Sequence, residues 1–302
     1  MSSGEAIRVT FCTAPRPLVS YICVWCPDLA PTKLGMEPTV EAAEADLVLF
    51  RVPLSGFCQR DLFVYKARSG GEGPSLWRVE DPDPYMLYRH STALLARRDK
   101  WASSPVSLGK LHVHMTANAI ALEGGLLGFV DPWRWRGILV CDVLGCKRGH
   151  HLPLPQHLIR LDKLQGEPLL YWDIAVVKGR LTFVELHRSI SGPDSSFNCP
   201  SWDVSTWSIS SPWEEQDGWR MDYMISTRNI TVDENTANVD LPPKLQDNGG
   251  MPKPSLGRLG IAHPTLSLSD SHVVYPMGKA GDWDKKTLVL SVDMRNERLQ
   301  GD

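Results

Sequence analysis

Cysteine and histidine are the residues of this chain whose spacing comes closest to that of chemical sites. Cys23-Val24-Trp25-Cys26 has the spacing of half a zinc site or of a thiol–disulfide pair. The next cysteine, Cys58, stands alone, and the motif ends an apolar, strand-like run instead of opening a helix. We therefore expect buried or half-buried thiols at Cys23 and Cys26.

A second group, Cys141, Cys146, His150 and His151, is the strongest metal-like cluster by number of ligands. A hairpin could bring Cys141 opposite His150 or His151, so a zinc site is geometrically possible. The alternative, which we prefer, is a strand cysteine that faces the core beside a solvated basic loop.

Other combinations that could carry chemistry are weaker. His112 and His114 share one face of a predicted strand, but no third ligand is close in the sequence. The chain contains no Gly-x-Ser-x-Gly motif, no phosphate loop followed by Lys-Ser or Lys-Thr, and no Gly-x-Gly-x-x-Gly after a strand. We expect no enzymatic activity, no metal and no cofactor.

Tryptophan is in excess, with 11 residues against seven tyrosines and seven phenylalanines. Most of them are Trp133, Trp135, Trp172, Trp202, Trp207, Trp213, Trp219 and Trp283. Packing of large rings between adjacent sheets is the first interpretation. The alternative is an exposed patch of Trp133, Arg134, Trp135 and Arg136 that binds a partner, because Trp and Arg are favoured interface anchors.

Short strands must position these residues. Runs rich in Val, Ile, Leu and aromatic residues, bounded by Gly, Pro, Asp and Ser, recur along the chain. They predict strands over 7–13, 19–25, 47–52, 62–66, 76–79, 111–115, 137–143, 174–177, 181–186, 204–209, 221–225, 265–268, 272–277 and 288–292. Short helices are predicted over 40–45 and 91–97. Residues 191–201 and 236–258 are predicted to be surface loops.

Three predicted hairpins suggest a repeating architecture. They span 128–142, 173–185 and 264–275, with intervals of about one and two units of the roughly 40–50 residues in a propeller blade. Residues 219–225 would supply the missing unit. We predict a mainly β fold, a β-propeller-like stack of short antiparallel sheets with one or two short helices, in a single domain over 1–302. An irregular stack of antiparallel sheets is the alternative.

Length and charge exclude several classes of function. A chain of 302 residues, 42% of them hydrophobic, can bury a core, and its net charge of -3 provides no positive field for nucleic acid or an anionic membrane. No apolar run reaches the roughly 20 residues of a membrane-spanning helix, and the first residues lack the pattern of a secretory signal. We expect a soluble monomer in the cytoplasm or nucleus, with reduced thiols.

A series of segments occurs in an order typical of one protein family. They are 129–133 (FVDPW), 136–144 (RGILVCDVL), 152–155 (LPLP), 172–180 (WDIAVVKGR), 183–185 (FVE), 202–208 (WDVSTWS), 256–259 (LGRL), 264–270 (PTLSLSD), 273–275 (VVY) and 292–296 (VDMRN). Together they resemble the uncharacterised plant family, expanded in grasses, that carries the domain of unknown function 1618. The likeness covers about 126–302, and 7–67 more loosely.

The resemblance implies no site residues, because the family has no established biochemical function. Some relatives are joined to F-box segments, which implies substrate recognition for ubiquitin ligation by analogy only. The chain departs from the family in its duplicated Trp-Arg at 133–136 and in a shorter stretch between Leu95 and Lys110. Three functions stay open: a protein-interaction scaffold, which we prefer, a small-molecule or carbohydrate binder or enzyme with a tryptophan-rich pocket, and a drifting paralogue without a retained role.

Overall fold

The computed structural model describes residues 6–14, 20–28, 30, 37–44, 46–53, 60–67, 73–79, 94–95, 102–103, 117–132, 136–142, 150–155, 168–189, 201–210, 218–232, 244–245, 253–254, 256, 259–279 and 287–300. The chain divides into two compact units. Unit 1 comprises residues 1–14 and 20–154, and unit 2 comprises residues 15–19 and 155–302. The expectation of a single domain over 1–302 stays a prediction.

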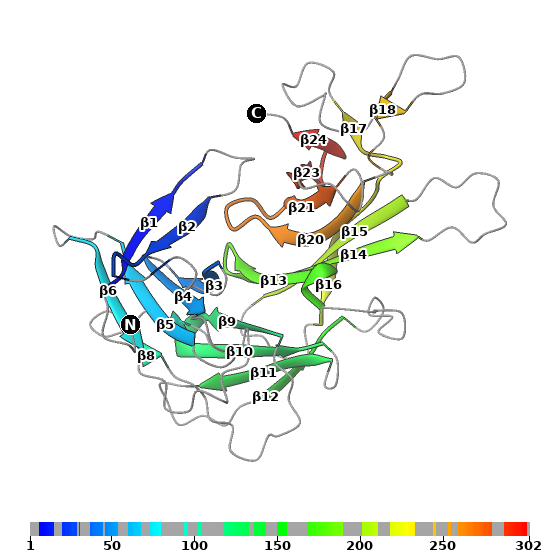
Figure 1. The fold of residues 1–302 in the computed structure, drawn as a ribbon. Coiled ribbons are helices and arrows are strands. Elements are labelled where there is room, and N and C mark those ends of the chain that lie inside the picture. The colour runs from blue at the N-terminus through cyan, green and yellow to red at the C-terminus, as the bar shows by residue number, and fades with distance from the viewer. Residues whose placement is uncertain are drawn as a thin grey trace. The chain divides into compact units, whose positions relative to one another are not determined.

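Unit 1 contains two four-stranded antiparallel sheets in which strands consecutive in the chain are neighbours (Figure 1). One consists of β3 (Thr39–Glu44), β4 (Leu47–Pro53), β5 (Arg60–Lys66) and β6 (Ser75–Val79), and the other of β9 (Asn118–Leu122), β10 (Leu126–Asp131), β11 (Gly137–Asp142) and β12 (His150–Pro153). Two hairpins pair β1 (Arg8–Cys12) with β2 (Tyr21–Trp25) and β7 (Leu94–Leu95) with β8 (Ala102–Ser103).

The β1–β2 hairpin covers one face of sheet β3–β6. Strand alternation turns its apolar side chains, such as Val9 and Val24, toward Phe50 and Phe63 of the sheet. The opposite face of the sheet carries a second apolar cluster, formed by Leu47, Leu49, Leu62 and Val64. Sheet β3–β6 is therefore buried on both faces.

A buried ion pair connects two strands of sheet β3–β6. The Nε atom of Arg51 in β4 lies 3.0 Å from Oε1 of Glu41 in β3, and the Glu41 side chain is fully buried. The register of the two strands shifts between Val40 and Ala42, on either side of Glu41. A buried charge is tolerated here because its partner is buried with it.

Unit 2 contains a third four-stranded antiparallel sheet and a six-stranded sheet. The first consists of β13 (Trp172–Val177), β14 (Arg180–Ser189), β15 (Ser201–Ser210) and β16 (Arg220–Ser226). The second has the order β17 (Thr231–Val232), β24 (Arg298–Gln300), β23 (Ser291–Asp293), β21 (Val273–Lys279) and β20 (Gly260–Leu266), with β22 (Leu288–Val289) also paired to β21. A short hairpin joins β18 (Lys244–Leu245) and β19 (Lys253–Pro254).

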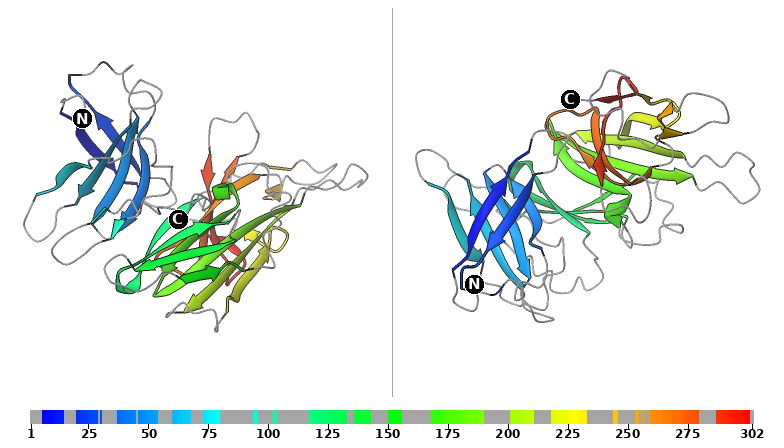
Figure 2. Two further views of the ribbon diagram at one scale, coloured as in Figure 1. Left: turned by 90° about the horizontal axis from the view of Figure 1, so that it is seen from below. Right: turned by 45° about the horizontal axis from the view of Figure 1, so that its top comes forward.

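The two large sheets of unit 2 share one apolar core, and the orange strands β20 and β21 lie beside the green sheet in both views of Figure 2. Trp202 and Val204 of β15 pack in this core with Ile261 of β20 and Val292 of β23. The Trp202 indole Nε1 donates a hydrogen bond to the carbonyl oxygen of Leu256 at 3.2 Å. Unit 2 is therefore held together by contacts between sheets that are far apart in the sequence.

Side chains of sheet β13–β16 also form hydrogen bonds with backbone groups of strand β20. Asp173 Oδ2 accepts a hydrogen bond from the backbone N–H of Leu266 at 3.0 Å, and Oδ1 accepts one from the N–H of Ile174 at 2.8 Å. Burial raises the pKa of Asp173, although these two N–H groups act in the opposite direction. The Arg188 guanidinium donates to the carbonyl oxygen of Ile261. Strand β20 is thus tied to its neighbouring sheet through polar contacts as well as through the core.

The predicted fold class, mainly β with short antiparallel propeller-like sheets, is confirmed. The hairpins predicted over 128–142, 173–185 and 264–275 correspond to β10–β11, β13–β14 and β20–β21. Lys178 and Gly179 have positive φ of 50° and 74°, which suits the two-residue turn of a type I′ hairpin. All three predicted hairpins are therefore present.

Other predicted elements differ from the structure. The helix predicted over 40–45 is wrong, because pairing with β4 makes this segment strand β3 despite its Ala and Glu content. Of the helix predicted over 91–97 only the two residues of β7 are described, and they form a strand. Residues 219–225 were predicted to supply a further blade, but residues 220–226 form β16, the fourth strand of sheet β13–β16. The helical turns among the described residues are two 3₁₀ turns, η2 (Glu123–Gly125) and η4 (Pro168–Leu170).

Two predicted loops and one strand fall largely outside the described residues. These are residues 111–115, 191–200 and most of 236–258. Within the last range, β18 and β19 form a hairpin and Leu256 is buried in the core of unit 2.

Candidate functional site

The predicted tryptophan and arginine patch is described at one residue. Trp133, Arg134 and Trp135 lie outside the described residues. Arg136 is exposed in the connection between β10 and β11, where its φ is 47° and its carbonyl oxygen accepts a hydrogen bond from the Leu154 N–H at 2.8 Å. The patch therefore stays a prediction.

The possible zinc ligands around Cys141 do not gather into a site among the described residues. Cys141 packs, half-buried, beside Leu127 and Phe129, and burial raises the pKa of its thiol. The His151 ring lies over Gly137, four positions along β11 from Cys141, so close that a Cβ at residue 137 would clash with it. Among the residues that the structure describes, no three His, Cys, Asp or Glu side chains are placed to hold a metal ion. Cys58, His112, His114 and Cys146 lie outside them.

Cys23 and Cys26 do not form a pair. Cys26 is buried, as predicted, with 1% of its surface exposed. Cys23 is exposed, so the expectation of a buried or half-buried thiol is wrong there, because strand alternation turns this side chain outward. Three residues of extended chain span about 10 Å, which is too far for a disulfide.

The most unusual surface that the structure describes is one face of sheet β13–β16. We call it the outer face, because it is turned away from the shared core of unit 2. The strand register places Trp172, Glu185, Ser205 and Met224 opposite one another in a row across the four strands. A second row on the same face consists of Ile174, Phe183, Trp207 and Met221.

Both rows become more exposed toward β16. Trp172 and Ser205 are 3% and 2% exposed, and Glu185 is 7% exposed. Met224 and Met221 at the other end are 60% and 48% exposed. The outer face is thus buried at β13 and open to solvent at the edge strand β16.

Several polar atoms of the outer face are buried without a hydrogen-bond partner among the described residues. They are Trp172 Nε1, Glu185 Oε2, Ser205 Oγ and Trp207 Nε1. Such an atom costs about 1–3 kcal/mol when it is left unsatisfied, so native proteins contain few of them. Their concentration in two adjacent rows therefore requires an explanation.

The imidazole of His187 lies beside the Glu185 carboxylate. Its Nε2 atom lies 3.3 Å from Glu185 Oε2, within ion-pair distance but without the alignment of a hydrogen bond. The pair could act as an ion pair when the imidazole is protonated. Glu185 Oε2 is therefore without a hydrogen bond among the described residues.

Aromatic rings surround the polar row. The Trp172 and Phe183 rings are stacked with centroids 5.9 Å apart, and the edge of Trp219 meets Phe183 at 6.3 Å. Trp202 lies on the opposite face, in the core. The tryptophans of this sheet are therefore divided between its two faces, so they do not simply pack against one another.

This arrangement is suited to binding. Two indole N–H donors, a carboxylate and a hydroxyl lie beside aromatic rings, which is the mixture found where a ligand or partner is oriented. Ser205 Oγ makes no hydrogen bond to Glu185 or to any other described residue, so no hydrogen-bonded base activates it there.

Sequence reasoning named Trp172, Trp202 and Trp207 but missed Glu185, His187 and Ser205. One signal was available in the sequence. Residues an odd number of positions apart on one strand face opposite sides of the sheet, so Trp202 and Trp207 could be assigned to different faces. The alignment of Glu185 with Ser205 depends on the register between strands, which the sequence does not state.

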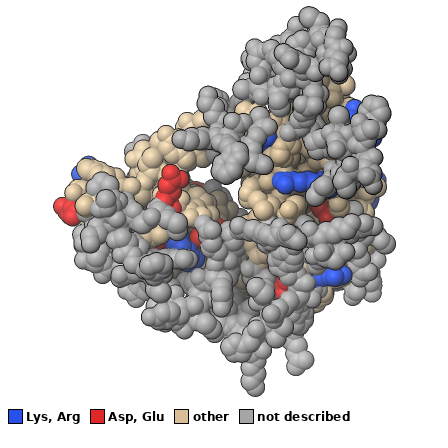
Figure 3. Space-filling model, turned by 45° about the vertical axis from the view of Figure 1, so that its right-hand side comes forward, with Lys and Arg blue, Asp and Glu red and all other residues tan. Residues whose placement is uncertain are grey.

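Among the described residues, charged side chains do not gather into a patch on the face shown in Figure 3. On the face shown in Figure 3, basic and acidic side chains of the described residues are scattered singly over the surface. The described part of the chain also contains no helix that is long and apolar enough to cross a membrane.

The comparisons with known proteins agree with the resemblance seen in the sequence. A search of curated proteins found no significant match. Residues 130–275 match the family described as a protein of unknown function, DUF1618. This stretch contains the whole of sheet β13–β16 and both rows of the outer face. Residues 130–275 of this chain are therefore similar to the DUF1618 family.

Proposed function

We propose that the chain is a non-catalytic protein-interaction scaffold that binds its partner at the open end of the outer face, over β15 and β16. The observation that carries this proposal is the position of two exposed methionines, Met221 and Met224. They end rows that contain buried polar atoms without a hydrogen-bond partner among the described residues. Methionine side chains adapt to varied partners, and the polar groups beneath them can fix orientation.

The edge of β16 supports the same proposal. β16 is the last strand of its sheet, and no described residue pairs with its outer edge. An exposed edge with apolar side chains is the kind of surface to which an extended peptide adds as a further strand. We therefore expect the partner to contribute an extended segment that pairs with residues 220–226.

The test is affinity capture with the full chain as bait, from extracts of plant tissue. The variant Met221→Ser/Met224→Ser removes the apolar end of the outer face. Leu268→Ser is the matched control, because Leu268 is also exposed, at 69%, but lies in the turn between β20 and β21. We expect a partner that the wild type and the control recover equally and the double variant recovers at least about tenfold less.

Direct binding of the purified partner should then slow amide hydrogen exchange over residues 220–226. Equal recovery of every partner by the double variant, or unchanged exchange in β16, would contradict the proposal.

A binder of a small polar molecule or carbohydrate is the second candidate. It is favoured by the indole N–H groups of Trp172 and Trp207 beside Glu185 and Ser205. A ligand of this class should raise the melting temperature of the wild type but not of Trp207→Ala. The absence of any shift across a panel of sugars and polar metabolites would remove this candidate.

Within the proposal, the chain is a plant protein that acts as a monomer in the cytoplasm or nucleus. The family resemblance supports the plant source, and the net charge of -3 supports a partner other than nucleic acid.

A further inference from the structure

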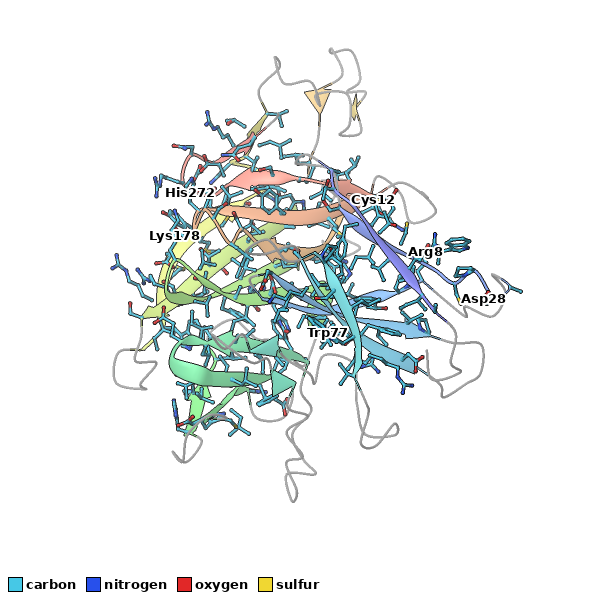
Figure 4. The ribbon with its side chains drawn as sticks, turned by 90° about the vertical axis from the view of Figure 1, so that its left-hand side faces the viewer. Arg8, Cys12, Asp28, Trp77, Lys178 and His272 are labelled. Atoms are coloured by element: carbon cyan, nitrogen blue, oxygen red, sulfur yellow. The ribbon has the colours of Figure 1, made fainter. Side chains whose placement is uncertain are left out.

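The outward side of the β1–β2 hairpin brings together thiols that are distant in the sequence. Its side chains alternate with those that pack on sheet β3–β6, and they are Arg8, Thr10, Cys12, Tyr21, Cys23 and Trp25. Figure 4 shows Arg8 and Cys12 along β1. Tyr21 and Trp25 are more than half exposed, at 59% and 55%, so small molecules can reach this side of the hairpin.

The strand register makes Cys12 and Cys23 diagonal neighbours. Cys12 is opposite Tyr21, and Cys23 is opposite Thr10, on the same side of the hairpin. Diagonal side chains are usually too far apart for a direct bond, but two-stranded sheets twist strongly and the twist shortens one diagonal. The Cys12 and Cys23 thiols lie near enough for Cys12 to raise the pKa of Cys23, as expected if theirs is the shortened diagonal.

We propose that Cys12 and Cys23 form a thiol–disulfide exchange site whose co-reactant is a low-molecular-weight disulfide such as oxidised glutathione. Both cysteines are free thiols in the structure, Cys23 exposed and Cys12 half-buried. The exposed Cys23 is the attacking sulfur, and Cys12 is the resolving one. This site is independent of the proposed partner surface on β16.

The exchange takes place in two steps. The Cys23 thiolate attacks one sulfur of the small disulfide, which forms a mixed disulfide and releases one small thiolate. The Cys12 thiolate then attacks the Cys23 sulfur and expels the second small thiolate. The two protein thiols lose two electrons, the small disulfide gains them, and the two protons end on the released thiols.

The surroundings of Cys23 determine how the rate depends on pH. Partial desolvation, followed by the charge of Cys12 and the hydrogen bond to it, raises the pKa of Cys23 above its usual value. Since the thiolate is the nucleophile, the first step should accelerate as the pH rises from 7 to 9. The nearby resolving thiol makes the second step intramolecular and therefore fast.

The structure also separates this pair from the Cys-x-x-Cys motif. Cys26 is buried and follows the end of β2, so it cannot reach Cys23 without rearrangement of the hairpin. A bond between Cys12 and Cys23 would instead tie β1 to β2 in the register that packs against Phe50 and Phe63. Oxidation should therefore stabilise the hairpin that covers sheet β3–β6.

The experiment uses the full chain equilibrated in buffers of reduced and oxidised glutathione. After free thiols are blocked, peptide mapping without reductant measures the fraction of Cys12 linked to Cys23. Cys12→Ser and Cys23→Ser are the test variants. Cys141→Ser, which alters a half-buried thiol in sheet β9–β12, is the matched control.

We expect the linked peptide in the wild type and in Cys141→Ser, and at least about a tenfold loss in both test variants. Cys12→Ser should stop at the mixed disulfide on Cys23. The melting temperature should rise on oxidation of the wild type but not of Cys23→Ser. A link between Cys23 and Cys26, or full alkylation of Cys12 and Cys23 in the most oxidising buffer, would overturn the proposal.

Discussion

Sheets β3–β6 and β13–β16 have the same four-stranded antiparallel topology, and each buries a glutamate, but the two carboxylates differ in their partners. Glu41 is paired with Arg51 at 3.0 Å. Glu185 has an oxygen without a hydrogen-bond partner among the described residues, and an imidazole beside it that is charged only when protonated.

The comparison separates a buried charge with a close partner from one whose carboxylate keeps an oxygen without a hydrogen bond among the described residues. A paired buried charge is strongly destabilising to break, because its removal leaves the other charge uncompensated. A buried charge without a partner already weakens the folded state, so its neutralisation should cost little or be favourable. Proteins tolerate such a loss of stability chiefly at functional sites.

The largest expected effect distinguishes the two faces of sheet β13–β16. Trp202→Ala should lower the free energy of unfolding by about 3–5 kcal/mol, because it empties the shared core of unit 2. Trp207→Ala, from the outer face, should cost less than half as much, since this residue is only half-buried. Denaturant unfolding measures both. Equal losses would show that the outer face is a second structural core, and the comparison would fail.

The next effect tests the two glutamates directly. Glu41→Gln should destabilise the protein by about 3 kcal/mol, because it leaves the Arg51 guanidinium without its buried counter-charge. Glu185→Gln should leave stability unchanged within about 1 kcal/mol or increase it. Thermal unfolding of the two isosteric variants gives the answer. A large loss for Glu185→Gln would mean that this carboxylate has a structural role after all.

A third carboxylate shows that buried carboxylates with hydrogen-bond partners are not confined to unit 1. Asp293, in unit 2, accepts hydrogen bonds from the backbone N–H groups of Arg295 and Asn296 and from the Asn296 amide. Burial would raise the pKa of Asp293, but the Asn296 hydrogen bonds, the charge of His272 and the Arg295 N–H together lower it below its usual value.

The smallest expected effect is therefore a pH dependence. Since the pKa of Asp293 is lowered by folding, its contribution to stability is present above the unfolded-state pKa of about 3.9 and is lost as the pH falls through the folded-state value. Asp293→Asn should flatten the decline of stability between about pH 5 and 2. Asp270→Asn, an exposed aspartate in the β20–β21 turn, is the control for the change of net charge. A curve for Asp293→Asn as steep as that of the wild type would contradict the lowered pKa.

Local signals predicted the strands and hairpins of this chain far better than its site. Apolar runs bounded by turn residues located β1, β2 and β13, and the hairpin predicted over 173–185 turns at Lys178 and Gly179. Strand β3 was missed because its pairing with β4 outweighs the helical preference of its Ala and Glu residues.

The site depends on register, which is a property of two strands and not of one. Glu185 meets Ser205 across β14 and β15, and Cys12 approaches Cys23 across β1 and β2. Neither contact follows from spacing in the sequence, and the Cys23 and Cys26 spacing pointed to a different pair. Register is determined by packing between distant segments, so it becomes visible only in the folded chain.

The polar contacts that sheet β13–β16 makes with β20 have a consequence for association between copies of this chain. β20 is the last strand of its sheet, and such edges can recruit identical strands and start aggregation. Here the Leu266 N–H already donates to Asp173, and the Ile261 carbonyl oxygen already accepts from Arg188. Pro264 has no backbone N–H that could pair with another strand. These contacts thereby protect β20 against pairing with other copies, whereas no described residue pairs with the outer edge of β16.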